Sequence, residues 1–409
     1  MDPRYSWRAR RRGLVVFIGI ACLHAAGARA DAGDTFNFGL AVSRTRDDNV
    51  FRLAPETDPR LAIGTADKGD ASTATTFTLA ADKTLGLQRL KLDARISTVR
   101  YDRFDFLDHE PSDLKAAWLW RLGNRLRGEL SAAYRESLDG FDDVLVPVRN
   151  ITTSESGFGS LFLRVGADWE AFVSAARNEA TSSNPARQAS NSRTETLETG
   201  LRYTPASGNW LSLRLRQADA AYPNQQFAAG TRVDNSYRQD DIGVDGAWQL
   251  SGASRIDGRI GHTRRRHDEL AARDYSGVTG RGALNWQVTG KTLINLSAQR
   301  EIEGNADGVS TFVVTDRLKL APSWLPTART RLDLSLEHSR RGFDGDPGIV
   351  LTALPKREDT IRAVSLSASY APHPSLLLSI SLRDENRDSN YSRLGYDYRM
   401  TGISALFSF

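Results

Sequence analysis

The chain has 409 residues, of which 25% are charged, 40% hydrophobic and 9% aromatic, and its mean hydropathy is −0.42. This average is too polar for a bundle of transmembrane helices and too apolar for a disordered chain. The net charge of +4 comes from residues 1–30, which hold six basic residues and one acidic residue; residues 31–409 keep 48 basic and 49 acidic residues, a net charge of −1. The basic excess therefore does not point to a nucleic-acid partner.

Residues 1–30 show the three regions of a secretory signal peptide in their usual order. Five arginines between Arg4 and Arg12 precede an apolar run at residues 14–23, and the small-residue pattern Ala28-Arg29-Ala30 follows. The run is about half of the ~20 residues that a spanning helix needs, which disfavours a membrane anchor. We expect cleavage after Ala30. The one cysteine of the chain, Cys22, would leave with this segment, so the exported protein would form no disulfide.

From residue 31 onward, apolar side chains recur at every second position. In residues 211–216, for example, leucines alternate with Ser212, Arg214 and Arg216. This period predicts β-strands with one apolar and one polar face, and no sustained helical period appears after residue 30. We count about eighteen such segments, centred near residues 39, 79, 95, 118, 130, 162, 173, 200, 213, 244, 259, 283, 296, 316, 334, 366, 380 and 403.

The connections between these segments alternate between short turns and long polar stretches. Short turns on one side and long loops on the other are typical of an outer-membrane barrel. We therefore predict an all-β protein, in which residues 31–409 form a single transmembrane antiparallel β-barrel with short periplasmic turns, long extracellular loops and no plug domain. The alternative is an exported soluble β-sandwich, propeller or solenoid, because soluble sheets also alternate. The absence of a propeller-type repeat argues against it.

Aromatic residues give a second indication of a membrane barrel. Each of the seven tryptophans after residue 30 lies within a few residues of a short connection, where a girdle at the membrane interface would place it. The chain ends with Phe407 and Phe409 two positions apart, which resembles the terminal strand that the barrel-assembly machinery recognises in outer-membrane proteins. The expected girdle consists of Trp118, Trp120, Trp169, Trp210, Trp248, Trp286 and Trp324.

The polar faces of the expected strands carry many charges. A barrel of eighteen strands leaves an aqueous channel, and buried charges would be costly, so these side chains should line a wet lumen. They could merely keep the interior hydrated, or they could select a polar or anionic solute. The candidates for lumen-lining residues are Asp93, Arg95, Arg127, Arg214, Arg216, Arg259, Arg331, Asp333 and Glu337.

Catalysis is not expected. His262 and His267 would lie toward the long-loop end of one strand, yet no spacing of nucleophile and base singles out a hydrolase site. The chain shows no zinc-ligand spacing, no phosphate-binding loop and no nucleotide fingerprint. We therefore predict no catalytic residues, no metal site and no cofactor.

One segment suggests a family. Directly after the first expected strand come Asp47, Asp48, Asn49, Val50, Phe51, Arg52 and Leu53. This segment resembles the motif near the mature N-terminus of EpsL-type exopolysaccharide biosynthesis or export barrels, a family that overlaps the broad group of β-barrel porins. An Asx-type turn at the strand end would also explain the Asp and Asn residues.

The resemblance implies an outer-membrane channel of a Gram-negative bacterium that exports an exopolysaccharide. Its partners would be the polysaccharide, outer-membrane lipid and lipopolysaccharide, the barrel-assembly machinery, and periplasmic or inner-membrane components of polysaccharide synthesis. Two alternatives remain. A substrate-specific uptake porin for sugars or carboxylates would have an inward-folded loop that narrows the pore, for which the loops at about 45–74 and 136–157 are long enough. An adhesion or structural barrel would need longer surface loops than these.

Overall fold

The chain folds into one closed sheet. The structure, a computed structural model, describes residues 35–143, 148–225, 234–304, 310–345 and 355–409. In these residues eighteen strands pair antiparallel, each with its neighbours in sequence, and β1 (Phe36–Asp47) closes the barrel against β18 (Tyr396–Ser408). Closure removes the sheet edges, so the backbone groups of every strand have partners on both sides, as a strand-built protein in lipid requires.

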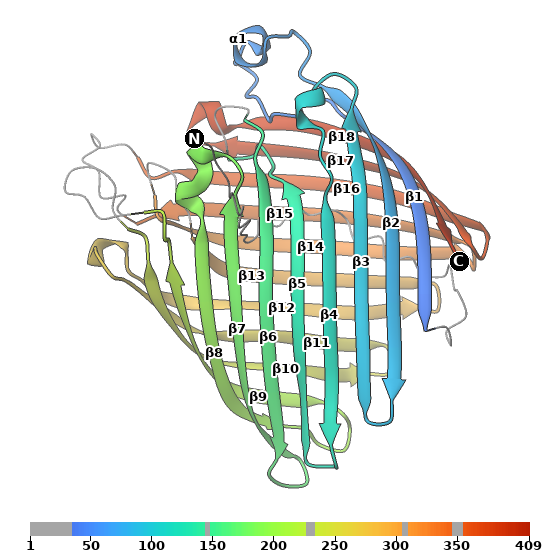
Figure 1. The fold of residues 1–409 in the computed structure, drawn as a ribbon, viewed down its shortest axis with the longest axis vertical. Helices are drawn as coiled ribbons and strands as arrows, with labels where there is room; N and C mark the ends of the chain where they lie inside the picture. The colour runs from blue at the N-terminus through green and yellow to red at the C-terminus, as the bar shows by residue number, and fades with distance from the viewer. Residues whose placement is uncertain (1–34, 144–147, 226–233, 305–309, 346–354) are drawn as a thin grey trace, which may run out of the picture.

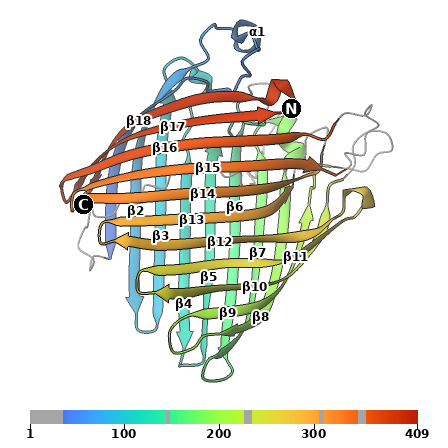
Figure 2. The same cartoon turned by 180° about the vertical axis from the view of Figure 1, so that it is seen from behind.

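The strands between β1 and β18 follow one another around the wall, as Figures 1 and 2 show from opposite sides. Strands β2 to β8 run down the near wall in Figure 1, and β10 to β17 cross behind them at a steep angle, which reflects strands that tilt around a common barrel. The bounds are β2 Asp70–Leu85, β3 Gln88–Tyr101, β4 Ser112–Leu122, β5 Leu126–Leu138, β6 Ile151–Arg164, β7 Trp169–Ser182, β8 Ser192–Tyr203, β9 Trp210–Ala221, β10 Tyr237–Ser251, β11 Ser254–His267, β12 Tyr275–Thr289, β13 Thr292–Gly304, β14 Phe312–Thr327, β15 Thr330–Asp344, β16 Glu358–His373 and β17 Leu376–Ser389.

Alternation along each strand assigns its two faces. On β9, Leu211, Leu213 and Leu215 are 49%, 54% and 50% exposed, which is unusual for leucine and marks the outer, lipid-facing side of the barrel. Arg214 and Arg216 have the opposite parity and therefore point to the interior. The same rule divides the other strands into an apolar outer face and a polar inner face.

Connections at one end of the barrel are short and those at the other end are longer. Strands β2 and β3 are joined by residues 86–87 and strands β10 and β11 by residues 252–253, whereas residues 48–69 join β1 to β2 and residues 139–150 join β5 to β6. In their described parts, the longer connections contain one α-helical turn, α1 (Pro59–Ile63), and four 3-10 helices: η1 Asp105–Leu107, η2 Pro185–Ser190, η3 Ala271–Arg273 and η4 Ser392–Leu394. Among the described residues, no helix is both long and apolar enough to span a membrane.

These observations confirm the predicted fold class. Each of the eighteen segments expected from the period-two pattern has its centre inside one of the strands β1 to β18. The structure is a closed antiparallel β-barrel and contains no soluble sandwich or propeller in the described ranges. The expected signal peptide, residues 1–30, lies outside the described residues.

Candidate functional site

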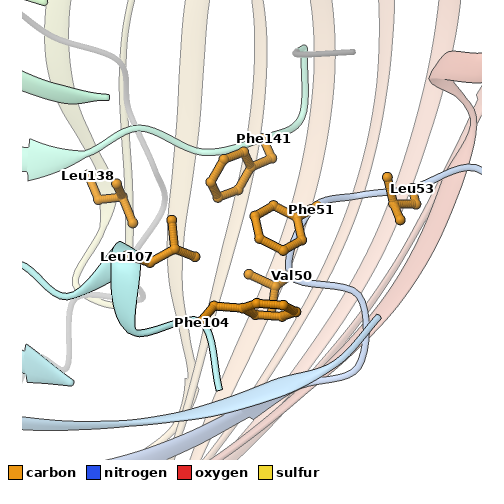
Figure 3. Close-up of a cluster of buried hydrophobic side chains, with 7 residues drawn as sticks. All are labelled: Val50, Phe51, Leu53, Phe104, Leu107, Leu138 and Phe141. Atoms are coloured by element: carbon orange, nitrogen blue, oxygen red, sulfur yellow. The ribbon is translucent and has the colours of Figure 1, made fainter. Parts of the chain in front are cut away.

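At the long-loop end of the barrel, three loops build an apolar cluster together. Phe51 of the β1–β2 loop lies at its centre, with ring centroids 4.8 Å from Phe104 of the β3–β4 loop and 4.8 Å from Phe141 of the β5–β6 loop (Figure 3). Aromatic rings at this spacing attract one another beyond the burial of their area. The cluster comprises Val50, Phe51, Leu53, Phe104, Leu107, Leu138 and Phe141.

The segment from Asp47 to Leu53 supplies the anchor of this cluster. An Asx turn ends β1, because Asp47 Oδ1 accepts a hydrogen bond from the Asn49 backbone N–H at 2.9 Å. Arg52 has a left-handed backbone (φ 55°), and its guanidinium pairs with Asp47 at 2.8 Å and lies 3.5 Å from the ring centroid of Tyr398 on β18. Asp48 Oδ1 accepts from the Arg399 backbone N–H at 2.7 Å. The segment therefore ties the β1–β2 loop to the inner side of the wall.

Residues 139–143 of the β5–β6 loop reach across the mouth. Its Asp142 and Asp143 contact side chains on β15, β17 and β18. Strands β1 to β4 separate β5 from β18 along one side of the wall, and strands β7 to β14 separate β6 from β15 along the other. The loop therefore cannot reach its partners along the wall and must cross the lumen.

Ion pairs between Asp143 and three little-exposed arginines hold the crossing loop in place. Asp143 accepts from Arg387 at 2.7 Å, from Arg357 at 2.6 Å and from Arg341 at 3.0 Å. Asp359 lies beneath them and pairs with Arg357 at 2.8 Å and also with Arg387; the side chains of Arg387 and Asp359 are 0% exposed. Removing either partner of the Arg387–Asp359 pair would leave an uncompensated buried charge, so this pair fixes the guanidinium groups that Asp143 contacts.

A second set of contacts joins Asp142 to the same region. The Tyr396 hydroxyl of β18 lies 3.0 Å from Asp142 Oδ1 and 3.1 Å from Glu385 Oε1, and the Arg387 guanidinium donates to the Asp142 carbonyl. Arg52 Nε lies 3.5 Å from Asp142 Oδ1, so the two loops also hold each other. We call the set Asp142, Asp143, Arg341, Arg357, Asp359 and Arg387 the loop clamp.

The charge of the loop clamp is set by its geometry. Burial works to raise the pKa of Asp143, but the facing guanidinium groups, Arg341 first and then Arg357, outweigh it and hold the pKa below the ordinary value of 3.8. Asp143 is therefore ionised throughout the neutral pH range. At the long-loop end of the lumen, the three carboxylates of the loop clamp thus lie among its three guanidinium groups.

All nine lumen-lining candidates have the inward parity of their strands, and most of them form ion pairs across the inner wall. Asp93 and Arg95 are the two for which no ion pair occurs among the described residues. The observed pairs are Arg127–Glu170 at 2.6 Å, Arg214–Glu198 at 3.0 Å, Arg216–Asp241 at 2.7 Å, Arg259–Glu301 at 2.9 Å, Arg331–Asp333 at 2.9 Å and Arg317–Glu337 at 2.9 Å.

The structure places six of the seven tryptophans of the expected girdle on the outer face and turns one inward. Trp210 opens β9 with the parity of Ser212 and Arg214, and the Arg202 guanidinium lies 4.2 Å from its ring centroid. The alternation of residues 211–216 already indicates that Trp210 points inward. Its position next to a short turn instead led to the expectation that it belongs to the outer girdle. Outward-facing are Trp118, Trp120, Trp169, Trp248, Trp286 and Trp324.

The two terminal phenylalanines lie at the seam that closes the barrel. The Phe409 ring is 5.8 Å from that of Phe38 on β1 and 5.7 Å from that of Phe407. Backbone hydrogen bonds of 2.9 and 3.0 Å join Phe38 to Phe409 in both directions. Their recognition by an assembly machinery stays a prediction.

His262 and His267, the two histidines considered from the sequence, lie on opposite faces of β11 and form no catalytic arrangement with each other. His262 lies on the outer face of β11, with Nε2 3.0 Å from the Ser276 hydroxyl, whereas His267 is buried on the inner face of the same strand. Within the described residues, no group of three or more His, Cys, Asp or Glu side chains could hold a metal ion.

Comparison with known proteins assigns this architecture to porin-like barrels. Residues 248–407 match the family model described as "Putative beta-barrel porin 2". The solved structure of OccK2 (OpdF) from Pseudomonas aeruginosa is 13% identical, covers 91% of this chain and 98% of its own, and has a TM-score of 0.51. The BenF-like porin from Pseudomonas fluorescens Pf-5 is 12% identical, covers 92% of this chain and 98% of its own, and has a TM-score of 0.48. No curated protein matches the chain.

The similarity to solved structures concerns the fold, since the identities are low, and the family match covers the eight C-terminal strands with the end of β10. The family model is described as a porin, so the EpsL-type exopolysaccharide assignment gains no support from this match. The family-model match over residues 248–407 agrees with the lipid-facing outer wall and the charged inner wall of the barrel. The protein is a porin-like channel barrel of the outer membrane of a Gram-negative bacterium.

Proposed function

We propose that the protein is a solute-selective channel for small hydrophilic solutes, such as sugars or carboxylates, and not a wide conduit for a polymer. The observation that carries this proposal is the β5–β6 loop, which crosses the lumen and is held by Asp143 against three arginines. A polysaccharide chain would require this loop to break the ion pairs of Asp143 with three arginines. A small solute can pass beside a fixed loop.

The inner wall supports the same proposal. It carries charges of both signs, many of them in ion pairs, so the wall offers hydrogen-bond donors and acceptors without a single dominant sign. Such a lining favours polar solutes that exchange their hydration shell for side-chain contacts. An adhesion role has no comparable basis, because the loops pack inward on one another at the mouth.

The test is single-channel conductance of the refolded protein in planar bilayers, with Asp143→Asn compared with wild type. The substitution removes the charge that three guanidinium groups face, so we expect the loop to loosen and the conductance to rise severalfold, while block by small sugars or carboxylates weakens. Asp316→Asn is the matched control, because Asp316 pairs with Arg300 at 2.8 Å on the outer face and both side chains are half-exposed.

The outcome separates the alternatives. Heat-modifiable gel mobility first establishes that each variant is folded. An unchanged conductance in Asp143→Asn would show that the loop does not set the pore. Wild-type channels that pass long polysaccharide fragments, and show no block by small solutes, would overturn the proposal in favour of polymer export.

A further inference from the structure

Three aromatic side chains interrupt the polar inner wall near its short-turn end. Phe162 of β6, Phe172 of β7 and Trp210 of β9 all have inward parity, and each lies close to a short connection. Phe162 and Phe172 stack with ring centroids 5.4 Å apart and an interplanar angle of 24°. Aromatic rings in the lumen of a channel need a reason, since the hydrophobic effect does not favour placing them against water.

The backbone of β8 is shaped to receive one of these rings. A Cβ atom on Gly200 would come within 2.8 Å of the Phe172 ring and 2.1 Å of the Leu213 carbonyl oxygen. A larger residue at position 200 would therefore displace the ring from its place on the wall. The aromatic cluster is part of the packed wall and not a loose set of side chains.

The rings hold two arginines that differ in their partners. Arg127 lies 4.1 Å from the Phe162 centroid and forms an ion pair with Glu170 at 2.6 Å. Arg202 lies 4.8 Å from Phe162, 5.8 Å from Phe172 and 4.2 Å from Trp210. Its Nε donates to the Ser212 hydroxyl at 3.2 Å, and within the described residues no carboxylate lies within 4.0 Å of it.

Because Arg202 has no carboxylate partner in the described wall, its guanidinium group can bind a solute. The rings attract the guanidinium of Arg202 through their π faces and orient it, but unlike a carboxylate they do not cancel its charge. The Nη groups of Arg202 are therefore left to donate to a partner that the described wall does not provide. A planar guanidinium presents paired donors that match the two oxygens of a carboxylate.

We propose that Arg202, cradled by Phe162, Phe172 and Trp210, is a subsite that binds the carboxylate of a solute near the short-turn end of the channel. The proposal rests on the proposed function as a solute-selective channel and names the solute class as carboxylates rather than neutral sugars. A neutral sugar would stack on open ring faces, whereas here the guanidinium groups of Arg127 and Arg202 lie over them. The subsite lies at the opposite end of the lumen from the loop clamp.

The experiment measures block of single-channel current in planar bilayers by galacturonate and, separately, by galactose, which differs in lacking the carboxylate. We expect galacturonate to block the wild-type channel and Arg202→Gln to weaken this block about tenfold, the loss of one charge-assisted pair. Arg202→Lys keeps the charge but loses the paired donors, so its block should be intermediate. Galactose should affect all variants equally.

The matched control is Arg95→Gln, which removes the same charge from an exposed inner-wall arginine on β3 that has no aromatic ring or ion pair in the described structure. Arg95→Gln should shift the reversal potential as Arg202→Gln does, yet leave galacturonate block as in wild type. If galacturonate block weakened equally in both variants, the effect would come from the overall charge of the lumen, and the proposed Arg202 subsite would be wrong. Wild-type channels that neither solute blocks would overturn the proposed function itself, so the two failures can be told apart.

Discussion

Asn49 shows how a single buried side chain fixes a loop to the barrel. The residue is 5% exposed, and its amide Nδ2 donates to the carbonyls of Leu53 and of Asp397 on β18, each at 2.9 Å. Its Oδ1 accepts from the Leu53 backbone N–H at 2.9 Å. All three contacts are to backbone groups, which would be left unsatisfied without this side chain. Asn49 therefore couples the loop turn to the wall directly.

Replacing Asn49 by alanine should destabilise the protein by about 1–3 kcal/mol, because buried donors and acceptors lose their partner. The measurement is urea unfolding of the lipid-reconstituted barrel, followed by tryptophan fluorescence. Asn386→Ala is the control, since its exposed amide makes one contact of 3.5 Å with Asp397 on the outer face. A loss no larger than in the control would show that Asn49 does not anchor the loop.

At the scale of elements, the loops depend on one another for their structure. The β1–β2, β3–β4 and β5–β6 loops each contribute only a few apolar residues to the cluster around Phe51. None of these sets is large enough to stabilise a loop alone, given the entropy that ordering a chain costs. The three loops should therefore order and open as one unit, on a barrel that stays closed by its backbone pairing.

The prediction for this unit is that Phe51→Ala opens the loops without unfolding the barrel. Phe51 is 2% exposed, and loss of a buried phenylalanine costs about 3–5 kcal/mol. Limited proteolysis should cut the β1–β2 loop faster in the variant, while heat-modifiable mobility stays that of a folded barrel. Phe106→Ala, at a phenylalanine that is 49% exposed beside the same cluster, should leave the cleavage rate near that of wild type. Equal rates in both variants would contradict a shared core.

At the scale of the whole molecule, the two ends of the barrel carry different features of the proposed channel. The long-loop end is narrowed by the loop clamp against β15 to β18, and the short-turn end carries the arginine–aromatic cluster on β5 to β9. A solute that enters from the long-loop side would pass the narrow part before it reaches Arg202. Selection by size and selection by charge would then occur at different depths of one channel.

The loop clamp makes conductance depend on pH in a defined direction. The pKa of Asp143 is lowered in the folded protein, so its contribution to the clamp is fully present above the ordinary value of 3.8 and is lost as the pH falls below it. Single-channel conductance should therefore stay constant from neutral pH down to about 4, near that ordinary value, and rise at more acidic pH. Asp143→Asn should abolish this acid-induced rise. A transition centred near pH 6.5 would instead point to a histidine.

The strands and their faces could be predicted from the sequence because alternation is a local property. A residue two positions along a strand returns to the same face whatever the rest of the chain does, so leucines 211, 213 and 215 identify the lipid side without a partner strand. The inward parity of Arg127, Arg214 and Arg259 follows from the same rule. Trp210 was expected on the outer face because it lies close to a turn, although its parity along the strand already indicates the inner face.

The sequence by itself determined the membrane class, the strand order and the two faces of the wall, since these depend on local period and on turns between neighbouring segments. Only the tertiary structure decided that Asp143 meets Arg341, Arg357 and Arg387, and that Arg202 lies among three rings. The partners of Asp143 lie about 200 to 245 residues further along the chain. No local pattern encodes such contacts, because they arise when barrel closure brings distant loops and strands to one mouth.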